Sequence, residues 1–158
     1  MANSNTTQVT GILSVPPIPQ KVGDIGGRVR TLQGDFTLAA LAGNAHQAGD
    51  TICIGKLPKG ARLLPQSCIV ISTAQGAATL SVGSAPSQAS GLLGGTITAA
   101  KYCSARAYPT AAEPLFMDQV ANLGVEITAA FGEDIYVTIG AASVTAGTLK
   151  SFLQYVVD

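Results

Sequence analysis

Apolar and polar residues alternate along several short runs of the chain, most clearly at Ile52 and Ile54 and again at Ile135, Val137 and Ile139. A period of two is typical of β-strands that bury one face. We therefore predict strands in the runs at residues 51–54, 68–72, 79–82, 125–129, 135–139 and 148–157.

The last run, residues 148–157, is apolar on both faces. Leu149 and Leu153 share one face, whereas Phe152 and Val156 share the other. A strand with two apolar faces is expected in the centre of a sheet or beneath another subunit.

Turn-forming residues separate these runs at 58–60, 74–76, 83–86, 94–95, 131–134 and 146–147. Short strands at such spacing predict an all-β sandwich or barrel. Residues 84–95 and 104–114 interrupt the spacing, and we expect them to be long loops that reach a partner. The helix candidates, residues 38–43 and 117–123, are too short to be stable alone.

The first 27 residues have a different character from the rest of the chain. They begin with Asn, Ser and Thr and continue into a proline-rich apolar stretch at residues 15–19. Proline fixes φ and removes a backbone donor, so this stretch is expected to be extended and polyproline-like. An extended apolar segment needs a surface to lie on; a frayed terminus is the alternative. We divide the chain into an N-terminal arm, residues 1–27, and a β-sandwich domain, residues 28–158.

Composition favours association with other proteins. The 158 residues predict one domain or two. Only 11% are charged and the net charge is zero, against a usual charged fraction of about 25%, and such a chain tends to associate. The sequence contains no cluster of Lys and Arg residues of the kind that indicates a nucleic-acid partner. No stretch of the sequence has the roughly 18 uninterrupted apolar residues that would predict a membrane-spanning helix. Residues 1–10 do not resemble a signal peptide. We expect a protein made in a cytoplasm.

The three cysteines predict neither a disulfide framework nor a zinc site. They cannot all pair within one chain, and none stand at Cys-x-x-Cys spacing. Cys53 and Cys68 lie in apolar runs, where a free cysteine behaves as a small hydrophobic residue.

Candidate catalytic chemistry is sparse. A triad mechanism would have to use His46, the single histidine, which we expect in a solvated connection. Glu133 and Asp134 are expected in a hairpin turn before a strand, with calcium binding as the weaker alternative. The chain lacks Trp, which disfavours a carbohydrate cleft, and phosphate-binding glycine motifs are missing. We predict no enzymatic activity, no cofactor and no metal.

Several segments carry a family resemblance. Residues 49–65 contain a strand and a Leu-Pro-x-Gly-Ala turn, residues 69–71 a second strand, and residues 78–83 a strand ending in Leu-x-Val-Gly. These segments, together with the ending at residues 140–157, resemble the jelly-roll decoration, or cement, proteins of tailed bacteriophages. The arm and the stretch at 84–95 depart from that family's pattern.

The resemblance implies a specific role. Such a protein would sit on the outside of a phage head, in the virion, as a homotrimer bound to the major capsid protein. It would stabilise the shell by mass action, because it binds the assembled shell and not its dissociated subunits. Several weak contacts made by one trimer would reinforce one another.

Residues and resemblance together predict a jelly-roll-like antiparallel β-sandwich with an extended N-terminal arm, acting as a capsid decoration protein. We predict that Val15, Pro16, Pro17 and Ile18 of the arm contact either the shell or the neighbouring protomer. The partners are then the major capsid protein and further copies of this chain, with no nucleic acid and no membrane.

Two other functions remain open at this point. The chain could be a phage fibre or receptor-binding module that recognises host glycans, with Tyr102 and Tyr108 as exposed loop anchors. It could also be an enzyme built on a jelly roll, for which His46, Glu133 and Asp134 are the best candidates.

Overall fold

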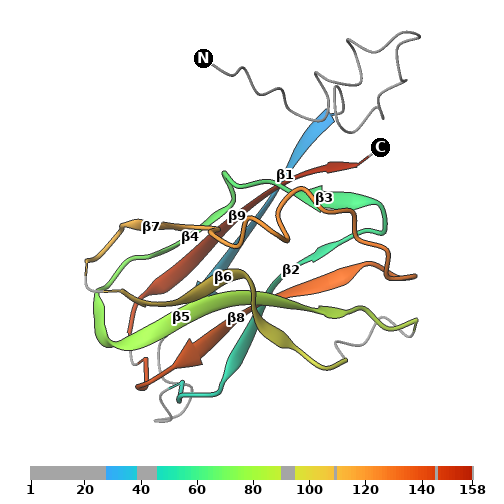
Figure 1. The fold of residues 1–158 in the computed structure, drawn as a ribbon. Helices are drawn as coiled ribbons and strands as arrows, with labels where there is room; N and C mark the ends of the chain where they lie inside the picture. The colour runs from blue at the N-terminus through green and yellow to red at the C-terminus, as the bar shows by residue number, and fades with distance from the viewer. Residues whose placement is uncertain (1–27, 39–45, 90–94, 109, 145, 158) are drawn as a thin grey trace, which may run out of the picture.

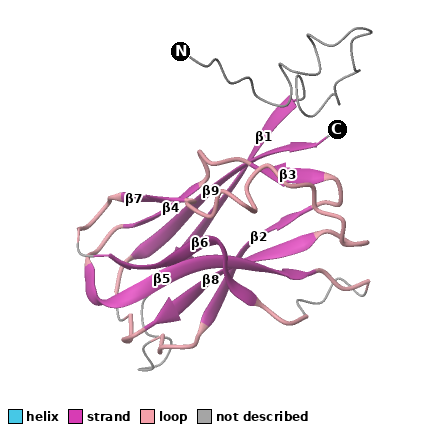
Figure 2. Cartoon of the chain, viewed as in Figure 1, coloured by secondary structure: helices cyan, strands magenta, loops and turns pink. Residues whose placement is uncertain are grey.

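The computed structural model describes residues 28–38, 46–89, 95–108, 110–144 and 146–157, and within them nine strands form two antiparallel sheets (Figure 1). Figure 2 shows strands and loops in this part of the chain, with no helix. The strands are β1 (Arg28–Thr37), β2 (Thr51–Leu57), β3 (Ala61–Leu63), β4 (Cys68–Ile71), β5 (Gln75–Pro86), β6 (Thr98–Tyr108), β7 (Pro114–Phe116), β8 (Glu133–Gly140) and β9 (Thr148–Val157).

The strand order is that of a jelly roll. One sheet runs β1-β9-β4-β7, and the other runs β2-β8-β5-β6. β3 and β4 both pair with β9, β3 near its end at Val157 and β4 further back at Phe152, so they act as one interrupted strand. Counted this way, eight strands form the two Greek keys of a jelly roll. The predicted all-β jelly-roll-like sandwich is confirmed.

The core lies between the two sheets and follows the predicted alternation. β9 is central, as its two apolar faces predicted, because β1 pairs with one of its edges and β3 and β4 pair with the other. The largest contributions from the inner faces are fully buried branched side chains: Leu63, Ile69, Ile71, Leu80, Val82, Ile135, Ile139, Leu149 and Leu153.

Two glycines permit close backbone approaches. A Cβ at Gly83 in β5 would overlap the carbonyl oxygen of Thr98, where the start of β6 crosses β5. Gly132 precedes β8 with a φ of +85°, and a Cβ there would overlap the carbonyl oxygen of Leu57 at the end of β2. Both crossings therefore depend on the absence of a side chain.

Some predicted elements differ from those observed. Residues 117–119 have no regular structure and residues 120–123 form turns rather than a helix, and of the candidate at 38–43 only Leu38 is described. Residues 125–129 form no strand and contribute one isolated bridge, from Glu126 to Arg62. The reason is that Gly124, with a φ of +74°, turns the chain immediately before this run.

The two long loops were also predicted wrongly in part. Residues 104–108 complete β6, and Ser84, Ala85 and Pro86 complete β5. These stretches lack a clear alternation of apolar and polar residues, so the sequence did not reveal them as strands. Pairing with neighbouring strands holds them in strand geometry. In the described part of the chain, no helix is long and apolar enough to cross a membrane.

Candidate functional site

His46 does not meet the acidic candidates. It forms a two-way backbone bridge with Val144, and its ring lies edge-on to Phe36 at 5.5 Å. It is half-buried rather than in a solvated connection, and its Nε2 is buried without a hydrogen-bond partner. Val144 follows the Gly140 end of β8, whereas Asp134 lies near the start of that strand, six residues or about 20 Å from Gly140. The three residues therefore form no common site.

Glu133 is buried in β8, so its prediction as a solvated turn residue is wrong. Its carboxylate accepts hydrogen bonds from Lys101 Nζ at 2.6 Å, from Ser84 Oγ at 2.7 Å and from the Tyr102 hydroxyl at 2.8 Å. Burial raises the pKa of Glu133, but the hydrogen bonds from Lys101, Ser84 and Tyr102 outweigh it and lower the pKa. These three donors stabilise the charged carboxylate in a buried position, so Glu133 has a structural role.

Asp134 is fully buried on the other side of β8, again contrary to the turn prediction. Its Oδ1 accepts a hydrogen bond from Ser87 Oγ at 2.7 Å and lies 4.0 Å from Lys56 Nζ. These two partners come from the segment after β5 and from β2, so the sequence around Asp134 gave no indication of them. Among the described residues, no group of three or more His, Cys, Asp or Glu could hold a metal ion.

Tyr102 and Tyr108 are not loop anchors. Both lie in β6 with only 2% and 3% of their surface exposed. Burial raises the pKa of Tyr102, and the charge of Glu133 raises it further. The Tyr108 hydroxyl accepts a hydrogen bond from the Ile71 amide at 3.0 Å and contacts the Glu113 carbonyl. The glycan-binding role predicted for these two residues is therefore wrong.

An ion pair joins β6 to the segment that follows β7. Arg106 Nη2 donates to Asp118 Oδ2 at 2.7 Å, and the Ser104 amide donates to Asp118 Oδ1 at 2.8 Å. Burial raises the pKa of Asp118, but the hydrogen bonds from Ser104, Gln119 and Arg106 hold it well below its usual range. A cavity of about 250 Å³ opens nearby, lined by Arg106, Ala107, Tyr108, Glu113, Pro114 and Leu115.

The outer face of the β1-β9-β4-β7 sheet carries a line of apolar side chains. Phe116 of β7 pairs with Cys68 of β4, and Cys68 pairs with Phe152 of β9. Their neighbours Leu115, Ile69 and Leu153 are buried in the core. Because successive strand residues point to opposite faces, Phe116, Cys68 and Phe152 all point outward. We call these three residues the outer apolar row.

The outer apolar row is open to solvent and continues into polar residues. Phe116 is 51% exposed, while Cys68 and Phe152 are half-buried. Phe152 pairs with Gln33 of β1 at the far end of the row. The next row along the strands contains Pro114, Val70, Lys150 and Asp35.

Sequence analysis identified only parts of this surface. The apolar second face of residues 148–157 included Phe152, and the alternation at 68–72 set Cys68 apart from Ile69. Phe116 lay in no predicted strand. The row exists only because three separate strands align these positions, and no local pattern encodes that register.

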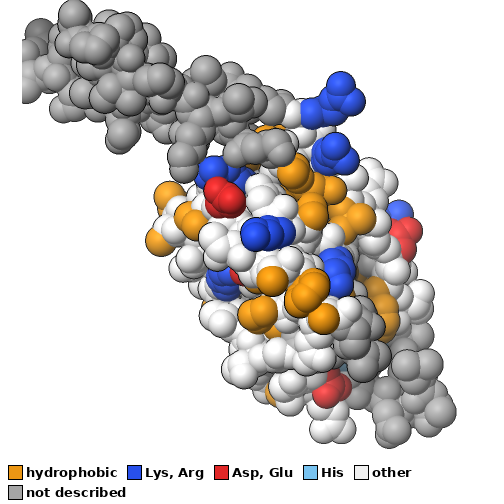
Figure 3. Space-filling view, turned by 90° about the vertical axis from the view of Figure 1, so that its right-hand side faces the viewer, with side chains coloured by type: hydrophobic (Ala, Val, Ile, Leu, Met, Phe, Trp, Pro, Cys, Tyr) orange, Lys and Arg blue, Asp and Glu red, His pale blue; other side chains and the backbone are white. Residues whose placement is uncertain are grey.

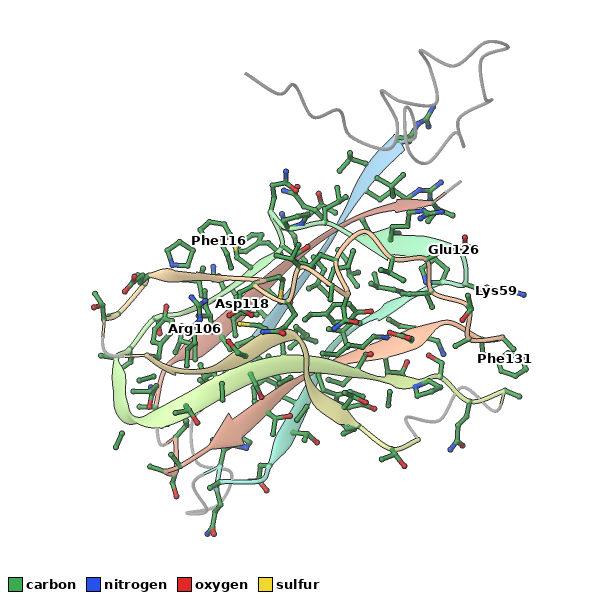
Figure 4. All side chains as sticks on the ribbon, in the orientation of Figure 1. Lys59, Arg106, Phe116, Asp118, Glu126 and Phe131 are labelled. Atoms are coloured by element: carbon green, nitrogen blue, oxygen red, sulfur yellow. The ribbon has the colours of Figure 1, made fainter. Side chains whose placement is uncertain are left out.

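Exposed apolar side chains also occur elsewhere. Figure 4 shows Phe116 and Phe131 at opposite ends of the molecule. Phe131 is 53% exposed and precedes β8. On the side seen in Figure 3, hydrophobic side chains gather between basic ones. The predicted contact residues of the arm, Val15, Pro16, Pro17 and Ile18, lie outside the described residues.

Comparisons with solved structures identify two chains with this fold. The chain is similar to a chain of the capsid of Ralstonia phage GP4, with a TM-score of 0.66 and 21% sequence identity, over 84% of this chain and 86% of that chain. It is also similar to a chain of the capsid asymmetric unit of cyanophage Pam1, with a TM-score of 0.57 and 20% identity, over 100% of both chains. No protein-family model matches the sequence, and no curated protein matches it. At these identities the likeness establishes a shared fold.

Proposed function

We propose that this chain is a structural protein of a bacteriophage virion that decorates the outside of the head. In this role it binds major capsid protein subunits as a homotrimer and stabilises the shell by bridging them. The observation that carries the proposal is the jelly-roll fold, shared over most or all of the chain with components of two phage capsids. Because one fold serves many functions, the chemistry of the surface has to support the same role.

The charged and polar groups of the described residues support a structural role. Glu133 is held by Lys101, Ser84 and Tyr102, and Asp118 is held by Arg106. These groups stabilise the fold, and among them only Arg106 lines the cavity beside β6. In contrast, the outer apolar row is exposed on a sheet face, where contact with another protein would remove it from water. A decoration protein needs such contacts and no covalent chemistry.

The test has two parts, starting with the mass of the purified protein in solution by light scattering. The second part is cosedimentation with heads, lacking this protein, of the phage that encodes it. We expect a species of about three times the chain mass that pellets with intact heads and raises their melting temperature. A monomer that stays in the supernatant would refute the proposal.

The arm has a test of its own. Removing residues 1–20 should abolish either trimer formation or head binding while the β-sandwich keeps its circular dichroism spectrum. A truncated protein that still forms trimers and still binds heads would exclude the arm as a contact segment.

A further inference from the structure

We propose that residues 15–19 of one copy dock on the outer apolar row of a neighbouring copy, as an extended polyproline-type segment lying across an aromatic surface. The inference rests on the self-association that the proposed function includes. It assigns a receiving surface to the arm and commits to a second copy of this chain as the donor.

The spacing of the two partners matches. Phe116 and Phe152 are separated by two strand-to-strand steps, with Cys68 between them, which is about 9.6 Å. A polyproline helix has three residues per turn and rises about 3.1 Å per residue, so positions i and i+3 share one side about 9.3 Å apart. Pro16 and Pro19 have this spacing. One proline can therefore cover each phenylalanine. Ile18 lies between the two prolines along the helix axis, on a neighbouring side of the helix, and so reaches the edge of the row beside Cys68.

The chemistry of the two partners also matches. Extended proline-rich segments are commonly recognised by aromatic-lined surfaces because they are stiff before binding and lose little entropy. Three of the five residues at 15–19 are prolines and have no amide to satisfy. Their carbonyl groups need donors, and Gln154 and Lys150 flank Phe152 on the same face of β9.

Charge favours this occupant over a charged partner. Residues 1–20 contain no charged side chain, and the outer apolar row is itself uncharged. Arg62 and Glu126, further along the same sheet, are paired with each other at 3.3 Å. The segment can cover Phe116, Cys68 and Phe152 without placing a charge of its own against them, which would be costly, while Lys150 stays at the edge of the contact.

The path of β1 points to a neighbouring copy rather than to the same chain. Gln33 is level with the outer apolar row, whereas β1 starts at Arg28, five residues or about 17 Å further along the sheet. Residues 28–31 are all exposed, and in Figure 1 this end of β1 extends beyond the second sheet. Arg28, the first described residue of β1, thus lies at the end of the strand that is away from its own row. A contact in which each copy donates one segment and receives another closes into a ring when its rotation allows.

The decisive experiment is a disulfide between copies. In a Cys53→Ser background, Ile18→Cys places a thiol where the proposed geometry brings it near Cys68 of the next copy. On mild oxidation by a copper–phenanthroline complex, we expect covalent dimers and trimers on non-reducing gels. Ser4→Cys in the same background is the matched control, and it should stay mainly monomeric.

The outcomes separate the alternatives. An intramolecular disulfide, seen as a monomer lighter by two hydrogens, would overturn the neighbouring-copy assignment. No cross-link, or equal cross-linking from Ser4→Cys, would overturn the docking site. Cosedimentation with phage heads tests the decoration role independently of the cross-link. A protein that binds heads without the cross-link refutes this inference alone, and a cross-linked protein that ignores heads refutes only the decoration role.

A second set of variants tests the receiving surface without new cysteines. Phe116→Ser combined with Phe152→Ser should weaken self-association by about tenfold or more. Phe131→Ser, equally exposed but far from the row, should leave it unchanged. Thermal melting checks that all variants fold. If the double variant associates as well as the parent, the outer apolar row is not the receiving surface.

Discussion

Gly132 shows how one residue sets the path of the chain into β8. It combines a φ of +85° with a backbone approach to Leu57 that leaves no space for a Cβ. We predict that Gly132→Ala lowers the free energy of unfolding by about 2–4 kcal/mol, because strain and overlap act together. Urea denaturation measures this change.

The control for Gly132 is Gly124. It also has a positive φ, +74°, but a Cβ there would meet no atom within 4 Å. Gly124→Ala should therefore cost only about 1 kcal/mol, from backbone strain alone. Equal losses in the two variants would show that overlap with Leu57 is unimportant.

Asp118 makes stability depend on pH at the β6 side of the sandwich. Its folded-state pKa lies well below the unfolded value because Ser104, Gln119 and Arg106 donate to the carboxylate. The stabilisation is therefore complete above the unfolded pKa of about 4 and is lost as the pH falls toward the folded-state pKa. Asp118→Asn should reduce stability at pH 7 by about 2 kcal/mol and flatten the decline below pH 4. Denaturation at a series of pH values measures both, and an unchanged acid slope would contradict the assignment.

At the scale of the element, β8 is held at its start by polar contacts. Lys101 of β6 supplies the cation for the buried carboxylate of Glu133. Lys101→Ala should destabilise the protein by about 2–3 kcal/mol, because it leaves a buried charge without its partner. The loss should be smaller in a Glu133→Gln background, and a double-mutant cycle measures the difference. Additive effects would mean that the pair does not act as a unit.

In β8, part of the strand could be predicted from the local sequence and part could not. Ile135, Val137 and Ile139 reveal their strand because a half-buried strand alternates. Glu133 and Asp134 read as a turn, since their donors Ser84, Ser87 and Lys101 lie far away in sequence. β6 was missed at residues 104–108 for the same reason, because its small residues are held by pairing with β5.

For the whole molecule, the jelly roll was predictable and the receiving surface was not. The repeated short strands, whose periodicity is local, predict an all-β sandwich or barrel, and the resemblance to phage decoration proteins adds the jelly-roll topology. The outer apolar row requires the register of β7 on β4 and of β4 on β9, which depends on chain closure over long sequence distances. The row also contains Phe116, from a strand of three residues that carries no pattern of its own.

The same surface determines how self-association should respond to solution conditions. The contact proposed here joins an uncharged segment to Phe116, Cys68 and Phe152, so burial of apolar surface provides its free energy. Raising the salt concentration from 0.1 M to 1 M shortens the screening length from about 10 Å to about 3 Å. We expect the association constant to change by less than about threefold over this range, and to fall on cooling as the hydrophobic contribution weakens. Sedimentation equilibrium measures both dependences. A tenfold loss of association in high salt would instead identify ion pairs, such as those available to Lys150 and Asp35, as the main contacts.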